Sequence, residues 1–107
     1  MKETQRAAAN ESAFRDANET MEQKADEITG GRGATPYLCE CDDPRCTEVI
    51  PLTRAQYEEI RAGSRIFVVA PGHQTQRDRV VAEHDGFTVI EKTGEEGALV
   101  EQQDPRS

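Results

Sequence analysis

The chain has 107 residues, of which 35% are hydrophobic and none is tryptophan, so it has room for one domain with a modest core. Its net charge is −8 and its Lys and Arg residues form no block, which argues against binding to nucleic-acid phosphates or anionic lipids. No apolar run reaches the roughly 20 residues of a membrane span or resembles a signal peptide, so we expect a cytoplasmic protein whose cysteines are reduced.

A helix is predicted over residues 7–28. Apolar residues recur there at spacings of three and four, which is typical of an amphipathic helix: Phe14, Ala17, Met21, Ala25 and Ile28. We expect this stripe to pack against the domain or a partner, with charged residues on the other faces. The glycine-rich segment 30–34 then predicts a flexible joint. It is not a phosphate-binding loop, because no strand precedes it and no Lys-Ser/Thr pair follows.

Two strands are predicted on either side of a cysteine-rich turn. Residues 35–39 lead into the turn and residues 47–51 leave it, so the two strands form a hairpin with the cysteines at its tip. A helix begins after Thr53, whose side chain can cap it, and Gln56 completes a capping box. Gly63 ends this helix.

The C-terminal half contains further strands. The run Ile66-Phe67-Val68-Val69 predicts a central strand covered on both faces, and Pro71-Gly72 predicts a turn just before His73. Residues 75–86 can form a second capped helix, which we favour because most of them are good helix formers. Alternatively, residues 79–84 form a strand that turns at Asp85-Gly86. In both cases residues 87–92 form a strand.

These elements predict a small zinc-stabilised α+β domain with a long N-terminal helix, a short mixed or antiparallel sheet and one or two short helices. We divide the chain into the amphipathic helix (1–29), the glycine-rich joint (30–34), the zinc-clasped domain (35–93) and an acidic flexible tail (94–107). A compact part of about 60–70 residues is near the size at which a small core benefits from a bound metal.

All three cysteines lie within the segment Cys39-Glu40-Cys41-Asp42-Asp43-Pro44-Arg45-Cys46. Asp43-Pro44 favours a turn that brings Cys46 back towards the other two. A Cys-x-Cys disulfide would be strained, and any single disulfide would leave an odd thiol. Thiolates clustered in this way are typical of structural zinc, and we predict that Cys39, Cys41 and Cys46 bind one Zn²⁺.

The fourth ligand must come from elsewhere in the chain. His73 is the preferred candidate because it follows a rigid Pro-Gly turn at the end of a strand, and His84 is the second. Glu48, Asp42 and Asp43 are less suitable, since thiolate-rich zinc sites usually complete their shell with nitrogen or sulfur.

The sequence does not indicate catalysis, and we predict that the protein is not an enzyme. Three cysteines and a histidine would fill a tetrahedral shell, whereas catalytic zinc needs an open position. The motifs His-Glu-x-x-His and Gly-x-Ser-x-Gly, and the paired motifs of the zinc deaminases, are all missing.

Three stretches carry a resemblance: the helix motif Asn10-Glu11-x-x-Phe14-Arg15-x-x-Asn18-Glu19, the cysteine motif Cys39-Glu40-Cys41-x4-Cys46-Thr47-Glu48, and Phe67-Val68-Val69-Ala70-Pro71-Gly72-His73. Through them the chain resembles a group of short bacterial proteins that are common in actinobacteria. The resemblance covers most of the chain and favours His73 over His84 as a ligand. It implies no activity and no substrate.

The leading functional hypothesis is a zinc-stabilised module that binds another protein, or a second copy of itself, through the N-terminal helix. A redox- or zinc-responsive regulator, whose cysteines release the metal on oxidation, is the alternative. A nucleic-acid-binding zinc ribbon is disfavoured by the negative charge, and a membrane role by the lack of an apolar span.

Overall fold

The computed structural model describes residues 2–30 and 32–106, and it confirms an α+β fold. A long N-terminal helix, α1 (Glu3–Thr29), is followed by strands β1 (Ala34–Leu38) and β2 (Val49–Thr53) and by helix α2 (Arg54–Arg61). Strands β3 (Ile66–Val69), β4 (Asp78–His84) and β5 (Phe87–Lys92) come next, and helix α3 (Gly94–Gln102) ends the fold. Residue 31, within the predicted glycine joint, lies outside the described residues.

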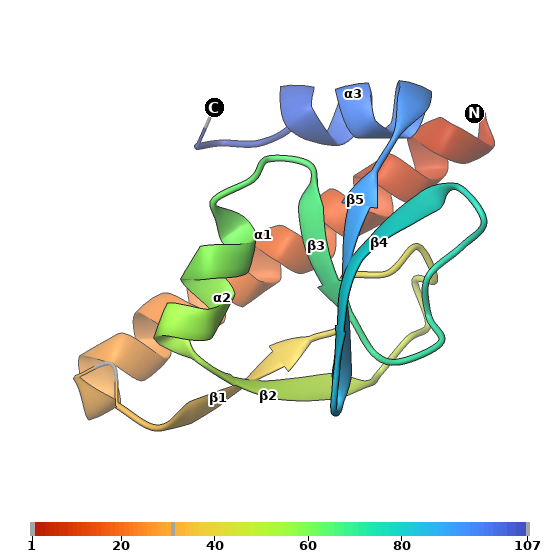
Figure 1. Ribbon diagram of the computed structural model, residues 1–107. Coiled ribbons are helices and arrows are strands. Elements are labelled where there is room, and N and C mark those ends of the chain that lie inside the picture. The colour runs from red at the N-terminus through yellow and green to blue at the C-terminus, as the bar shows by residue number, and fades with distance from the viewer. Residues whose placement is uncertain (1, 31, 107) are drawn as a thin grey trace.

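The strands form two separate antiparallel sheets (Figure 1). β1 and β2 make a two-stranded hairpin, and the other sheet has the order β3-β5-β4. Helix α1 runs behind β3 and α2 in Figure 1, with the β1–β2 hairpin below it, and its 27 residues correspond to about 40 Å of helix. That length equals the longest dimension of the molecule, 40 Å, so α1 spans the whole molecule and the shorter elements pack along it.

Helix α1 packs against the domain mainly through a polar face, and its predicted apolar stripe is only partly buried there. The alternative, that the stripe packs against a partner, stays a prediction. Ile28 is 84% exposed, and the rest of the predicted stripe is at most partly buried. The buried face instead consists of Ala7, Ala8, Glu11, Arg15, Asn18 and Glu22. These positions also recur at helical spacing. Arg15 and Asn18 bind backbone groups of the neighbouring segments, whereas Glu11 and Glu22 contact the side chains of Lys92 and Tyr37.

Arg15 shows why a charged residue occupies this face. Its guanidinium donates to the carbonyl oxygens of Ser64 and Ile66, at 2.9 and 2.8 Å, and lies 3.6 Å from the centre of the Phe67 ring. An alanine at this position would leave both carbonyls without these buried partners. The side chain therefore fixes the position of β3 against α1.

The predicted capped helix and hairpin are confirmed. Thr53 Oγ1 accepts from the Gln56 amide at 3.2 Å, and Gln56 Oε1 accepts from the Thr53 amide at 2.8 Å, which is the expected capping box. Tyr37 of β1 stacks on Tyr57 of α2 with ring centres 4.2 Å apart. This pair forms the part of the core that joins the hairpin to α2.

Two predictions about the second sheet are wrong. The favoured helix over residues 75–86 is strand β4, which turns at Asp85-Gly86 into β5, as in the alternative. The run of residues 66–69 is fully buried beyond Ile66, but β5 and not β3 is the central strand. The free edge of β3 is covered by Glu40, whose amide donates to the Val68 carbonyl at 2.8 Å.

The predicted flexible tail is also wrong for most of its length. Residues 94–102 form α3, which lies along the N-terminal half of α1 (Figure 1), and Val100 is fully buried. Glu96 of α3 is buried beside Lys92, which also contacts the carboxylates of Glu11 and Asp78 at 2.5 and 2.7 Å. An ion cluster therefore ties α1, β4, β5 and α3 together.

Candidate metal centre

The loop between β1 and β2 carries the three cysteines, and backbone hydrogen bonds set its shape. The Cys39 amide donates to the Glu48 carbonyl at 3.1 Å, which continues the hairpin for one more pair. The Asp43 side chain then accepts from the Arg45 amide at 2.9 Å, and the Cys46 amide donates to the Asp43 carbonyl at 3.1 Å. This turn, predicted from Asp43-Pro44, brings Cys46 back to the start of the loop.

His73 reaches the same point from the other sheet. It follows β3 through a turn in which its amide donates to the Ala70 carbonyl at 3.0 Å. Gly72 occupies the turn with a φ of 84°, a conformation that favours glycine. The Pro-Gly turn therefore places the imidazole next to the cysteines, as the sequence predicted.

The four predicted ligands lie together, with all their ligand atoms within 4.8 Å of one another. His73 Nδ1 is 3.6 Å from Cys39 Sγ and 3.6 Å from Cys46 Sγ. A tetrahedral zinc ion, with bonds of about 2.3 Å to sulfur and about 2.0–2.1 Å to nitrogen, separates these two kinds of ligand by about 3.6 Å. The four side chains are thus close enough to hold a metal ion.

The pKa values of the three thiols differ. The pKa of Cys41 is lowered to about 5, mainly because the neighbouring Cys39 thiol donates a hydrogen bond to it. That donation and burial raise the pKa of Cys39. The Ala70 amide also donates to Cys39 Sγ at 3.2 Å, a bond that stabilises negative charge on the sulfur. Burial also raises the pKa of Cys46, so the negative charge of the group lies mainly on Cys41.

Glu40, between two of the cysteines, points away from them into the core. Its carboxylate accepts from Tyr57 Oη at 2.6 Å, Asn18 Nδ2 at 3.0 Å and the Val68 amide at 3.1 Å, and its side chain is 1% exposed. Burial raises the pKa of this carboxyl. Sequence reasoning missed this role, although alternation along an extended Cys-Glu-Cys segment signals that the middle side chain faces the other way.

Helix α1 holds the backbone of the cysteine loop. Arg6 donates to the Asp42 carbonyl at 3.0 Å, and Asn10 donates to the Cys41 carbonyl at 3.1 Å. Asn18 pairs with the backbone of Leu38 in both directions, at 3.0 and 2.7 Å. The N-terminal helix is therefore part of the site, which the sequence did not reveal.

The other proposed ligands are elsewhere. His84 stands at the end of β4, where its ring stacks on Phe87 with centres 4.7 Å apart. Asp42 contacts Arg77 at 3.1 Å, and neither Asp43 nor Glu48 belongs to the group that could hold a metal. Cys39 and Cys41 are buried, whereas Cys46 and His73 are partly exposed.

The fold and the site together define a small α+β domain with a Cys₃His group that could bind a metal. No protein-family model matches the chain, and no curated protein and no solved structure is significantly similar to it. The resemblance to short actinobacterial proteins therefore stays a prediction. Among the described residues, no helix is long and apolar enough to cross a membrane.

Proposed function

We propose that this protein is a non-enzymatic module that is stabilised by one structural Zn²⁺ and binds another protein. The observation that carries the proposal is the Cys₃His group, in which sulfur and nitrogen lie at the separation that tetrahedral zinc requires. Three thiolates and an imidazole favour zinc over the hard cations Mg²⁺ and Ca²⁺, which take oxygen ligands.

A structural role is favoured over a catalytic one. Four protein ligands would fill the shell of the ion, and two of them are buried. Glu40, the carboxylate nearest in sequence to Cys39 and Cys41, serves the core and faces away from the metal group. Free thiols of this kind fit a reducing compartment such as the cytoplasm.

Native mass spectrometry of protein purified without added metal tests the proposal. We expect one zinc ion per chain, and we expect a chelator to remove it with loss of the circular dichroism signal of the native fold. His73→Ala should weaken zinc binding strongly, while His84→Ala is the matched control and should retain full zinc. A metal-free wild type with an intact fold, or equal zinc loss in both variants, would refute the assignment.

The accessibility of Cys46 favours redox-responsive release of the metal as a second candidate function. Hydrogen peroxide would convert the Cys46 thiolate to a sulfenic acid, with release of hydroxide. Condensation with the Cys41 thiol would then form a disulfide and water, and the metal would lose two ligands. Zinc release at a small excess of peroxide, reversed by a thiol reductant, would support this function, and inert thiols would exclude it.

A further inference from the structure

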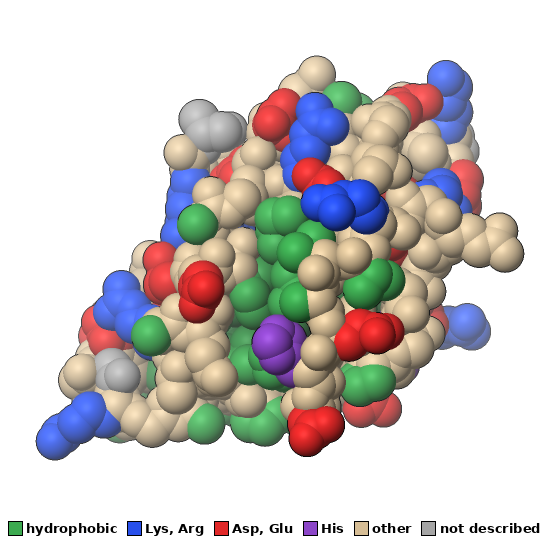
Figure 2. Space-filling view, viewed as in Figure 1, with side chains coloured by type: hydrophobic (Ala, Val, Ile, Leu, Met, Phe, Trp, Pro, Cys, Tyr) green, Lys and Arg blue, Asp and Glu red, His purple; other side chains and the backbone are tan. Residues whose placement is uncertain are grey.

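A groove of about 470 Å³ lies between α2 and the outer face of the three-stranded sheet, away from the metal group. Figure 2 shows it as a strip of apolar side chains open to the surface, with a histidine beside it. The apolar lining comes from four elements, and its members are Ile60, Ile66, Val81, Ala82, Phe87 and Val89.

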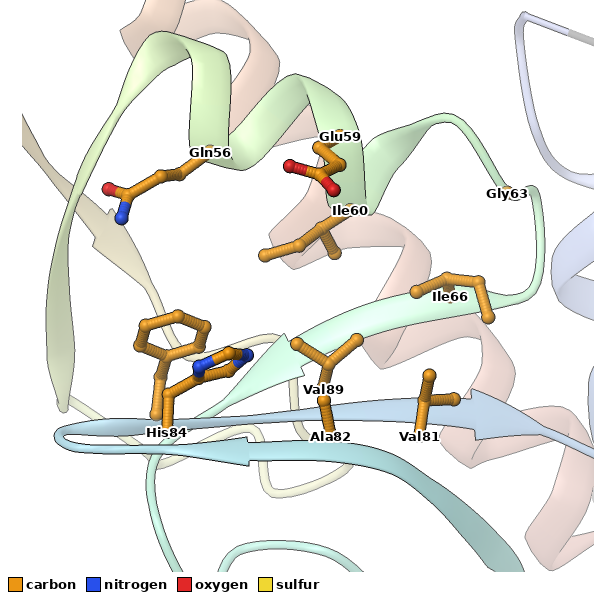
Figure 3. Close-up of a pocket in the computed structure, with 10 residues that line it drawn as sticks. Gln56, Glu59, Ile60, Gly63, Ile66, Val81, Ala82, His84 and Val89 are labelled. Atoms are coloured by element: carbon orange, nitrogen blue, oxygen red, sulfur yellow. The ribbon is translucent and has the colours of Figure 1, made fainter.

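The groove is open towards β4 because, among the described residues, α2 is the only helix that lines it. The register between β4 and β5 shifts between Val80 and Ala82, so Val81 is an extra residue. As a result both Val81 and Ala82 line the groove, and Figure 3 shows the Val81 side chain turned towards α2. Val81 is 45% exposed, so much of its apolar surface is open to solvent.

The wall of the groove carries one carboxylate. Glu59 of α2 is on its wall (Figure 3), and among the described residues it forms no ion pair. None of the described residues that line the groove is a Lys or Arg. Arg79, on the same face of β4 as Ala82, is paired with Glu91 at 2.6 Å. With a net charge of −8 on the chain, the groove is complementary to a cationic, apolar partner.

We propose that this groove binds an amphipathic helix of a partner protein, whose apolar face is flanked by Lys or Arg. The inference rests on the proposed protein-binding function and moves its surface from α1 to the space beside α2. A helix placed there would lie next to α2 at the usual 8–10 Å and complete the helical layer over the sheet. Its apolar residues at i, i+3 and i+4 would cover Val81 and Ala82, and its basic residues would meet Glu59.

The test uses fluorescence anisotropy with the zinc-loaded full chain and a labelled synthetic helix of Leu and Lys in amphipathic order. A peptide with Glu in place of Lys and a scrambled Leu/Lys peptide are the probe controls. Val81→Lys is the disrupting variant. Val80→Lys is the matched control, because Val80 is 41% exposed on the same strand but pairs with Ile90 on the opposite face.

We expect saturable binding of the amphipathic Leu/Lys peptide alone. Val81→Lys should weaken it by about tenfold or more, the cost of one buried valine. Val80→Lys adds the same charge and should change the affinity for the peptide by less than about twofold. Glu59→Gln should weaken peptide binding about two- to fivefold.

Three outcomes would overturn the proposal: binding of the Leu/Glu peptide as tight as that of the Leu/Lys peptide, equal losses in the Val80 and Val81 variants, or no binding at all. Complete displacement of the peptide by phenethylamine at micromolar concentration would assign the groove to a small molecule instead. Zinc content is measured on every sample. A zinc-loaded protein that does not bind the peptide would refute the proposal that the groove is a binding site. A wild-type protein without zinc would refute the proposal of a structural metal site.

Discussion

Glu22 illustrates how a single carboxyl on the buried face of α1 depends on its surroundings. Its side chain is 4% exposed, accepts a hydrogen bond from Tyr37 Oη at 3.0 Å and lies against the carboxyl group of Glu58. Burial, and then the hydrogen bond to Glu58, raise its pKa from the ordinary 4.5 to about 7. The charge of Glu58 is held by Arg106, at 3.0 and 3.1 Å, so the shared proton belongs to Glu22.

This raised pKa predicts a pH-dependent effect of Glu22→Gln. The folded state binds the proton more tightly than the unfolded state, so the stabilisation is complete below pH 4.5 and is lost as the pH rises through 7. Glutamine mimics the protonated form at every pH. We therefore expect the free energy of unfolding of the variant to exceed that of the wild type by an amount that widens by about 2–3 kcal/mol between pH 5 and pH 8.

Urea unfolding of both proteins in buffers from pH 5 to 8, with zinc present, measures this difference. Glu27→Gln, an exposed position on the same helix, is the control and should show no such trend. A gap that stays constant with pH, or that favours the wild type at pH 8, would contradict the proton on Glu22.

The metal group is the part of the molecule that individual residues predict best. Thiols in a short loop, and a histidine after a Pro-Gly turn, allow few arrangements. The spacing of Cys39, Cys46 and His73 in the sequence was therefore enough to predict that their side chains lie together. The supporting contacts of Asn10 and Asn18 were not predictable. An asparagine on a helix looks like a surface residue until the packing of the loop against that helix is known.

Among the elements, local signals were read correctly and non-local ones were not. The capping box of α2 is complete within four residues, and that helix was predicted correctly. The segment that forms β4 has good helix formers, but the turn at Asp85-Gly86 and pairing with β5 decide its structure. Helix α3 has no side-chain cap at Thr93 and contains two glycines, so its stability comes from tertiary packing that the sequence does not display.

Helix α3 and the residues that follow it should therefore be essential to the fold. Asp104 pairs with the guanidinium of Arg61, at 2.9 Å through Nη1, and lies 3.7 Å from Arg15 Nη1. All three side chains are buried. A chain that ends at Thr93 would leave two buried guanidinium groups without this carboxylate, and breaking a buried ion pair costs about 3–5 kcal/mol.

We expect the chain ending at Thr93 to lose cooperative urea unfolding followed by circular dichroism. A chain ending at Asp104 is the control. It loses the partly exposed ion pairs of Arg106 with Glu58 and Glu19, each of which contributes about 1 kcal/mol or less, and the bond of the Arg106 amide to Asp104. It should therefore keep cooperative unfolding. Equal stability of both truncated chains would show that α3 is dispensable.

For the whole molecule, the metal group matters because its ligands come from both sheets. Cys39, Cys41 and Cys46 belong to the loop of the β1–β2 hairpin, whereas His73 follows β3 of the other sheet. In the described residues no strand of one sheet pairs with a strand of the other. A bound ion would thus join two sheets that are otherwise connected through Glu40, α1 and the side chains of the core.

This arrangement predicts that metal removal loosens both sheets and not only the cysteine loop. Hydrogen exchange followed by mass spectrometry can compare peptides covering β1 and β5 before and after chelation. If the dissociation constant of the ion is about 1,000-fold below the free zinc concentration, removing the ion lowers the free energy of global opening by about 4 kcal/mol. Hydrogen exchange in both peptides should then become about 1,000-fold faster. His84→Ala is the control and should leave the response to chelation unchanged. Faster exchange confined to residues 39–46 would mean that α1 and the core hold the two sheets without the metal.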